Sequence, residues 1–330
     1  MMTDPYLQAR IALLRQAVAG DAPPEMYFEL AEALAEAGEP REAGATFRRG
    51  YLLQPSIYPL LGEGLGGTRA ELEARRDYAA TLAGNGAGFS PVLAALAVAE
   101  AHLGNSVAVR RLVDHERFFH NALMALPDDL DRADFNRALA AEILSGLKYY
   151  DRPSRHAIRR AWRQNDIMAS PLPALQRWGQ LIRDTIDRYI AALPAARDHP
   201  FLAARPADYA IESWALSSDG ESFHMPHIHP RAWMSGVYYV SRPEISRAPG
   251  GLEGWLHVGP PAMHGVSAEQ GWAERMVAPE PGSLVMMPAY FYHWTKPMGV
   301  DEERICLVFD VVPVELAEAG TGDDRDDGAG

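Results

Sequence analysis

The chain has 330 residues, 48% hydrophobic composition, a formal net charge of −13 and one cysteine, Cys306. This length can fill two hydrophobic cores, so we expect two domains. The acidic balance argues against binding the phosphate backbone of a nucleic acid. A single cysteine excludes an intrachain disulfide, and the sequence shows no apolar signal segment and no apolar run of membrane-spanning length. We therefore expect a cytoplasmic protein that binds neither nucleic acid nor membrane.

The first third of the chain has a helical pattern. Apolar residues recur at helical spacing between residues 6 and 19, and the pattern breaks at Gly20. From Tyr27 onward, residues fall at the offsets of a tetratricopeptide (TPR) repeat, in which two antiparallel helices touch: Leu30, Ala31, Leu34, Ala43, Phe47 and Pro55. Further helices are expected over about 68–83, 90–103 and 105–112. Residues 1–111 are predicted to form a TPR-like helical domain, and a helical domain that merely packs on its neighbour remains the alternative.

The pattern changes after Arg111. Residues 112–119 are predicted to form a strand, and two amphipathic helices are expected over 131–147, with Asp131 or Asp134 as the N-cap, and over 173–192. Short apolar segments separated by Gly, Pro and Ser then follow, at residues 209–216, 226–229, 234–240, 252–258, 283–287, 290–294 and 304–312.

Many short strands without intervening helices predict a barrel or jelly roll. The fold class expected is therefore α+β with two domains: helical repeats followed by a jelly roll with supporting helices over residues 112–314. The segment 315–330 is acidic and rich in glycine, so we expect a disordered tail.

Histidines are concentrated in the strand-rich part, where six of the eleven lie between residues 224 and 293. His227 and His229 are two apart on an expected strand, so their side chains would leave the same face and can share one metal ion. An open mononuclear site needs three protein ligands, and His293, which follows the turn at Pro288, is the third candidate. His224 could be a ligand, an outer hydrogen-bond partner or a substrate contact.

Arg304 begins the last predicted strand. A guanidinium binds a carboxylate through two parallel hydrogen bonds and stays charged when buried, so a buried arginine here predicts an anion beside it. Two other interpretations stay open at this point: an ion pair with Asp310, or an exposed strand edge after the charged turn 301–303.

These segments resemble the bacterial 2-oxoglutarate/Fe(II)-dependent dioxygenases of the double-stranded β-helix (jelly-roll) class. The resemblance covers about residues 112–314 and is carried by Trp214, Pro226–Pro230, Ser235–Tyr239, Gly282–Pro288, His293 and Glu303–Ile305. It implies iron ligation by His227, by the second residue after it and by His293, with Arg304 binding the distal carboxylate of 2-oxoglutarate. It also implies a reaction in which O₂ converts 2-oxoglutarate to succinate and CO₂ while a substrate C–H bond is hydroxylated.

The chain departs from the pattern of that class at two positions. His229 stands where the class has Asp or Glu, which removes one negative charge from the metal site. Cys306 stands where many members have a serine that helps to bind 2-oxoglutarate, and a thiol is a weak hydrogen-bond donor. Ser235 and Tyr238 are candidates to compensate at the cofactor, together with Tyr239 and Trp214.

A helical repeat ahead of such an oxygenase, with the segment 309–316 at its end, is similar to the aspartyl/asparaginyl β-hydroxylases. That similarity makes a peptide or protein, captured by the TPR-like domain, the candidate substrate. Two alternatives remain. The histidine spacing is close to the metal motifs of cupins, so the first alternative is a cupin-type three-histidine dioxygenase that does not use 2-oxoglutarate. The second alternative is a non-catalytic TPR-based binding protein.

Overall fold

The computed structural model describes residues 4–20, 22–55, 58–61, 67–146, 149–150, 158–195, 198–242, 252–299 and 302–319. The helices are α1 (Pro5–Val18), α2 (Pro24–Glu36), α3 (Pro40–Leu53), α4 (Tyr58–Leu61), α5 (Arg69–Gly84), α6 (Ser90–His102), α7 (Ser106–Leu112), α8 (His115–Phe118), α9 (Arg132–Gly146), α10 (Pro173–Ala192), α11 (Pro200–Ala203) and α12 (Val314–Ala319). The strands are β1 (His120–Leu123), β2 (Tyr149–Tyr150), β3 (Ile158–Asn165), β4 (Tyr209–His227), β5 (Met234–Tyr239), β6 (Leu256–Val258), β7 (Arg275–Val277), β8 (Ser283–Pro288), β9 (His293–Thr295) and β10 (Arg304–Pro313).

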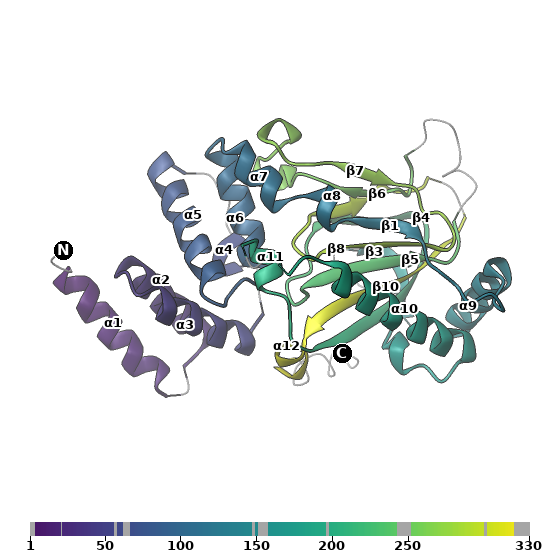
Figure 1. Ribbon diagram of the computed structural model, residues 1–330, viewed down its shortest axis with the longest axis horizontal. Helices are drawn as coiled ribbons and strands as arrows, with labels where there is room; N and C mark the ends of the chain where they lie inside the picture. The colour runs from purple at the N-terminus through teal and green to yellow at the C-terminus, as the bar shows by residue number, and fades with distance from the viewer. Residues whose placement is uncertain are drawn as a thin grey trace.

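Helices α1–α7 form one end of the molecule, and the sheet forms the other (Figure 1). Proline occupies the first turn of α1, α2, α3 and α6, where its missing N–H would have no helical partner. Thr68 and Glu71 form a reciprocal capping box at the start of α5. The helices expected over the first 112 residues are confirmed, whereas their assignment as TPR repeats stays a prediction. Within the described residues, no helix is both long and apolar enough to cross a membrane.

Helix α6 joins the two ends of the molecule. Its sequence is apolar on every face, and nearly all of its side chains are buried, as expected for a helix enclosed on all sides. One continuous core runs from Ala31 in α2 through α6 and the strands to Leu316 in α12, while a smaller cluster lies between α1 and α2. The helical region and the sheet therefore share their hydrophobic core.

The strands form one antiparallel, barrel-like sheet, so the architecture is mixed α/β. Strand β4 is central because it pairs with β10 along its first half, with β9 near its end, and with β3. Helix α10 runs across the sheet in Figure 1 and directs an apolar stripe toward it; the Trp178 ring lies 6.4 Å from that of Phe309 in β10.

Three expectations about the elements need correction. The strand expected over 112–119 is wrong, because the Asp114 side chain caps the short helix α8, and the strand β1 starts only at His120. The segments 209–216 and 226–229 are not separate strands, since β4 is continuous and ends at His227. Of the expected disordered tail, residues up to 319 belong to helix α12, and residues 320–330 lie outside the described residues.

Candidate active site

The structure brings His227, His229 and His293 together, with one nitrogen of each ring within 4.8 Å of the others. His227 is the last residue of β4, and it pairs directly with His293, the first residue of β9. His229 lies beyond the end of β4 in a turn, so the three rings converge from two paired strands and one turn and not from one strand face. The expectation that the side chains of His227 and His229 leave one face of a strand is therefore wrong, whereas the three histidine side chains do lie together as expected.

The rings of His227 and His293 are oriented by backbone carbonyls. Nδ1 of His227 lies 2.7 Å from the carbonyl oxygen of Met225, and Nδ1 of His293 lies 3.0 Å from that of Phe291. A carbonyl only accepts, so Nδ1 must carry the proton in each ring and Nε2 keeps its lone pair. This is the arrangement that prepares an imidazole to bind a metal ion.

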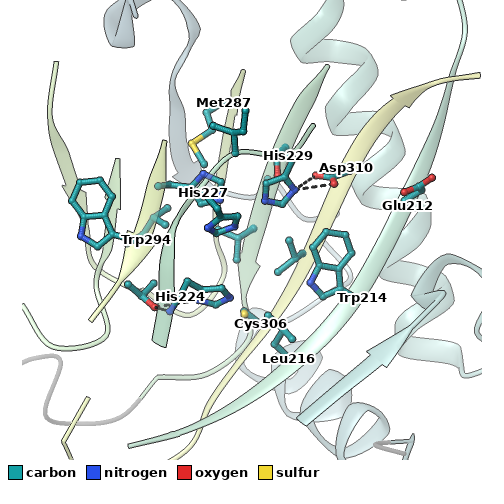
Figure 2. A pocket seen from close by; sticks show the side chains of 18 of the residues that line it. Glu212, Trp214, Leu216, His224, His227, His229, Met287, Trp294, Cys306 and Asp310 are labelled. Atoms are coloured by element: carbon teal, nitrogen blue, oxygen red, sulfur yellow. Dashed lines mark hydrogen bonds and ion pairs between the residues drawn. The ribbon is translucent and has the colours of Figure 1, made fainter. Parts of the chain in front are cut away.

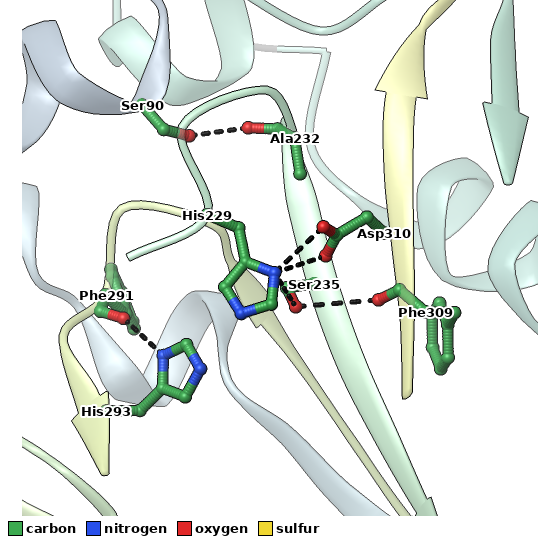
Figure 3. A network of polar contacts seen from close by, with 8 residues as sticks. All are labelled: Ser90, His229, Ala232, Ser235, Phe291, His293, Phe309 and Asp310. Atoms are coloured by element: carbon green, nitrogen blue, oxygen red, sulfur yellow. Dashed lines mark hydrogen bonds and ion pairs between the residues drawn. The ribbon is translucent and has the colours of Figure 1, made fainter. Parts of the chain in front are cut away.

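The ring of His229 is oriented by a carboxylate (Figure 3). Its Nδ1 lies 2.7 and 2.8 Å from the two oxygens of Asp310, with the hydroxyl of Ser235 at 3.3 Å. Trp214 stacks on the same ring with the centroids 5.9 Å apart. Nε2 of His229 is buried and has no hydrogen-bond partner among the described residues, which is costly unless a ligand meets it.

Burial keeps the imidazoles of His227 and His293 neutral at ordinary pH. It lowers the pKa of His227 to about 3, with a further contribution from His229, and it lowers the pKa of His293 well below the usual value. Neutral rings are the form that binds metal ions, so none of these groups needs to lose a proton before ligation at pH 7.

The histidines line an open cavity of about 410 Å³ (Figure 2). Its walls come from β4, β5, β9 and β10, and its lining also contains Trp214, Tyr239 and an ion pair between Glu212 and Arg231 at 3.0 Å. His224 lies in the same cavity, outside the cluster of three, with Nδ1 3.1 Å from the hydroxyl of Thr295.

Arg304 lines the cavity from the start of β10 and is only 2% exposed. Its Nη1 donates to the carbonyl of Gly254 at 2.6 Å, whereas its Nε is buried with no partner in the described part of the chain. The ion pair with Asp310 and the exposed edge, left open above, are both wrong, because Asp310 is bonded to His229 and Arg304 is buried. A buried guanidinium with an unused donor fits a carboxylate ligand.

The other predicted cofactor residues divide into two groups. Ser235 and Cys306 line the cavity, and burial raises the pKa of the Cys306 thiol, so it stays protonated. Tyr238 does not line it: successive side chains of a strand point to opposite faces, and its hydroxyl donates to Asn136 at 2.6 Å on the far side of β5. Tyr239 lines the cavity in its place.

Asp310 is the functional residue whose position the sequence did not reveal. Its signal was a single carboxylate inside the otherwise apolar segment 305–312, which requires a buried partner, but the sequence offered Arg304 and not His229 as that partner.

The residues present fit an Fe(II) ion. One ring nitrogen of each histidine converges on a common point, and each ring has a partner on Nδ1, which leaves Nε2 for a metal ion. The carboxylate of Asp310 beside His229 supplies the negative charge that the three neutral ligands lack.

Comparisons with known proteins agree with this site. Residues 212–310, less than a third of the chain, match the sequence profile of the family described as "Putative 2OG-Fe(II) oxygenase". This segment contains the three histidines, Arg304 and Asp310. No protein of a curated set matches by sequence.

Several solved structures are similar at low identity. A prolyl-4-hydroxylase from Pseudomonas putida is 19% identical and covers 64% of this chain and 97% of its own, with a TM-score of 0.41. A prolyl hydroxylase from Trichoplax adhaerens, in complex with a hypoxia inducible factor oxygen degradation domain peptide fragment, is 13% identical and covers 67% and 94%, with a TM-score of 0.44. HygX from Streptomyces hygroscopicus, with nickel, 2-oxoglutarate and hygromycin B bound, is 13% identical and covers 62% and 86%, with a TM-score of 0.37.

The chain is a 2-oxoglutarate-dependent dioxygenase, and its cofactors are Fe(II) and 2-oxoglutarate, with O₂ as the oxidant. The cupin-type and non-catalytic alternatives are set aside by the family match.

Proposed function

We propose that this enzyme hydroxylates a peptide or protein substrate at an Fe(II) centre held by His227, His229 and His293. The observation that carries the ligand assignment is the common state of the three rings, in which Nδ1 is hydrogen-bonded and one ring nitrogen of each lies within 4.8 Å of the others. When bound, Fe(II) and 2-oxoglutarate supply the oxidising chemistry: one oxygen atom of O₂ enters succinate as CO₂ leaves, and the other enters the substrate C–H bond as a hydroxyl.

The chain's own residues bind and orient the co-substrate. Arg304 binds the distal carboxylate of 2-oxoglutarate, because its charge is buried in the cavity and its Nε has no other partner in the described chain. Ser235, Tyr239 and the neutral thiol of Cys306 complete the cofactor side of the cavity. His224 lies beside the histidine cluster, with its ring centroid 5.9 Å from that of His227, and it lines the same cavity as Arg304.

The substrate class is inferred from the surface beside the cavity. Pro230 and Arg231 form part of the cavity wall, and the hydroxyl of Tyr51 in α3 donates to the carbonyl of Pro230 at 2.7 Å. The helical region therefore contacts the cavity wall, and a substrate chain held by that region would lie beside the cavity. The ion pair between Glu212 and Arg231 places one anionic and one cationic side chain in the same wall, and groups of this kind interact with the amides of a peptide.

The test is an incubation of the Fe(II) enzyme with 2-oxoglutarate, O₂ and a peptide library, read by mass spectrometry. A mass gain of one oxygen atom on a subset of peptides, with matching succinate, is the expected result. Succinate formed with small-molecule substrates and with no peptide would contradict the proposed substrate class.

A further inference from the structure

The turn that carries His229 is held differently from the other two histidines. His227 and His293 lie in paired strands, so the sheet fixes their backbone. The N–H of His229 donates to the carbonyl of Ala289 at 3.0 Å, and His229 then begins a turn in which the N–H of Ala232 donates to the carbonyl of His229 at 3.3 Å, with Pro230 at the second position. Beyond His229, the turn has two carbonyls, those of Pro230 and Ala232, that meet other parts of the chain.

Both of these carbonyls accept hydrogen bonds from the helical region. The Tyr51 hydroxyl in α3 donates to Pro230 at 2.7 Å, and the Ser90 hydroxyl at the start of α6 donates to Ala232 at 2.6 Å (Figure 3 shows the second). The partners are 179 and 142 residues apart in the sequence. Two side-chain hydroxyls, one from each of two helices, thus donate to backbone carbonyls of one short turn.

The donor side chains are rigidly placed. Tyr51 is fully buried, and its ring stacks on Phe89 at 4.3 Å and on Phe47 at 5.9 Å. Ser90 is 4% exposed. The Ser90–Ala232 bond is buried and the Tyr51–Pro230 bond is part-buried, so loss of either hydroxyl leaves a carbonyl with a desolvation cost, and both bonds favour the observed position of the turn.

The side chain between the two carbonyls is held as well. Arg231 bonds to Glu212 in β4 and to the carbonyl of Leu316 in α12. The turn is therefore held from the helices on one side and from the sheet and α12 on the other. The position of the turn's backbone determines where the ring of His229 lies relative to the rings of His227 and His293.

We propose that Tyr51 and Ser90 are positioning residues that place His229 at the metal centre, so the helical region is a structural part of that centre. This inference rests on the proposed role of His229 as a ligand. The helical region then has a second role besides any capture of substrate: the three-histidine site is complete only when α3 and α6 are docked on the turn.

The test is a titration of the purified full chain with Co(II), without 2-oxoglutarate, following the dissociation constant and the visible spectrum of the bound ion. The variants are Tyr51→Phe, Ser90→Ala and the double variant. Tyr27→Phe is the matched control, because the Tyr27 hydroxyl also meets a backbone carbonyl, that of Val18 at 3.4 Å, but within the helical region.

We expect the double variant to bind Co(II) about tenfold more weakly and each single variant about threefold, as for other outer partners of metal ligands, with a changed visible spectrum. Tyr27→Phe should match the wild type in both, even where its thermal midpoint falls as far as that of Tyr51→Phe. A purely structural role would lower the midpoints without moving the spectrum.

Two results would overturn the inference in distinguishable ways. If the wild type binds Co(II) and all variants bind it with unchanged affinity and spectrum, the helical region does not position His229, and the ligand assignment stands. If the wild type binds no Co(II), the ligand assignment fails and the inference fails with it. If the double variant does not fold, the two single variants give the same decision, since each removes one hydroxyl only.

Discussion

Removing the charge of Asp310 should weaken metal binding without unfolding the site. Both carboxylate oxygens lie within 2.8 Å of Nδ1 of His229, and the two side chains are about 10% exposed, so the contact is little screened by water. A hydrogen bond to a charged group contributes about 1.5–3 kcal/mol, and a neutral one about 0.5–1.5 kcal/mol. A bound metal draws electron density from the ring and strengthens the Nδ1–H donor, so much of this energy should appear in the metal affinity.

Two substitutions separate orientation from charge. Asp310→Asn keeps an oxygen that can accept from Nδ1 but loses the charge, so we expect about tenfold weaker Co(II) binding, equal to about 1.4 kcal/mol. Asp310→Ala loses both, and binding should weaken up to about a hundredfold.

The assay is calorimetric titration with Co(II) at fixed pH and ionic strength. Glu142→Gln is the matched control, because the Glu142 carboxylate also accepts hydrogen bonds, from the backbone N–H groups of Ala174 and Leu175, but does not line the cavity. Binding by both Asp310 variants within twofold of the wild type would contradict the prediction. An equal loss in Glu142→Gln would also contradict it, because the effect would then not be specific to the partner of His229.

Other consequences concern the ligand set, the core and pH. His229→Asp alone should weaken Co(II) binding, because it places a second carboxylate beside that of Asp310. The double variant His229→Asp/Asp310→Asn should bind Co(II) more tightly than His229→Asp alone. Titrations in which the double variant binds no more tightly would contradict the contact between residues 229 and 310. Saturation with Co(II) at 100 times its dissociation constant should raise the free energy of unfolding by about 2.7 kcal/mol, and a chelator should reverse this in thermal melts. Trp178→Ala should cost about 3–5 kcal/mol in urea unfolding, because the ring is fully buried against β10. Burial lowers the pKa of His115 to about 4, below its ordinary value of about 6.5, so as the pH falls the unfolded chain takes up this proton first. The free energy of unfolding should therefore fall by up to about 3 kcal/mol from pH 6.5 to 4, and His115→Leu should flatten this slope.

The sequence alone predicted the residues whose signal is local. The spacing of His227, His229 and His293 and the position of Arg304 marked the cavity, because short-range spacing and residue chemistry are both readable in one dimension. The helices were predicted well for the same reason, since the apolar periodicity of 173–192 coincides with α10.

What the sequence did not predict depends on contacts between distant segments. Tyr238 and Tyr239 are adjacent residues of the same type, so the sequence does not distinguish them. Only the register of β5 in the sheet decides which one faces the cavity. Asp114 lies within the segment 112–119, which has strand-like composition, but its side chain caps a helix. The bonds from Tyr51 and Ser90 to the turn after His229 join residues more than 140 positions apart, which no local pattern can indicate.

The most direct test of the central claim is an anaerobic titration of the apo-protein with Fe(II) and 2-oxoglutarate, following the visible charge-transfer band of the iron-bound co-substrate. The same titration is made with Arg304→Ala and with Arg163→Ala, which removes another arginine of the cavity wall. We expect a band in the wild type and in Arg163→Ala at similar 2-oxoglutarate concentrations, and a band in Arg304→Ala only at a much higher 2-oxoglutarate concentration. Iron binding with no band in the wild type, or the same concentration dependence in all three proteins, would contradict this expectation.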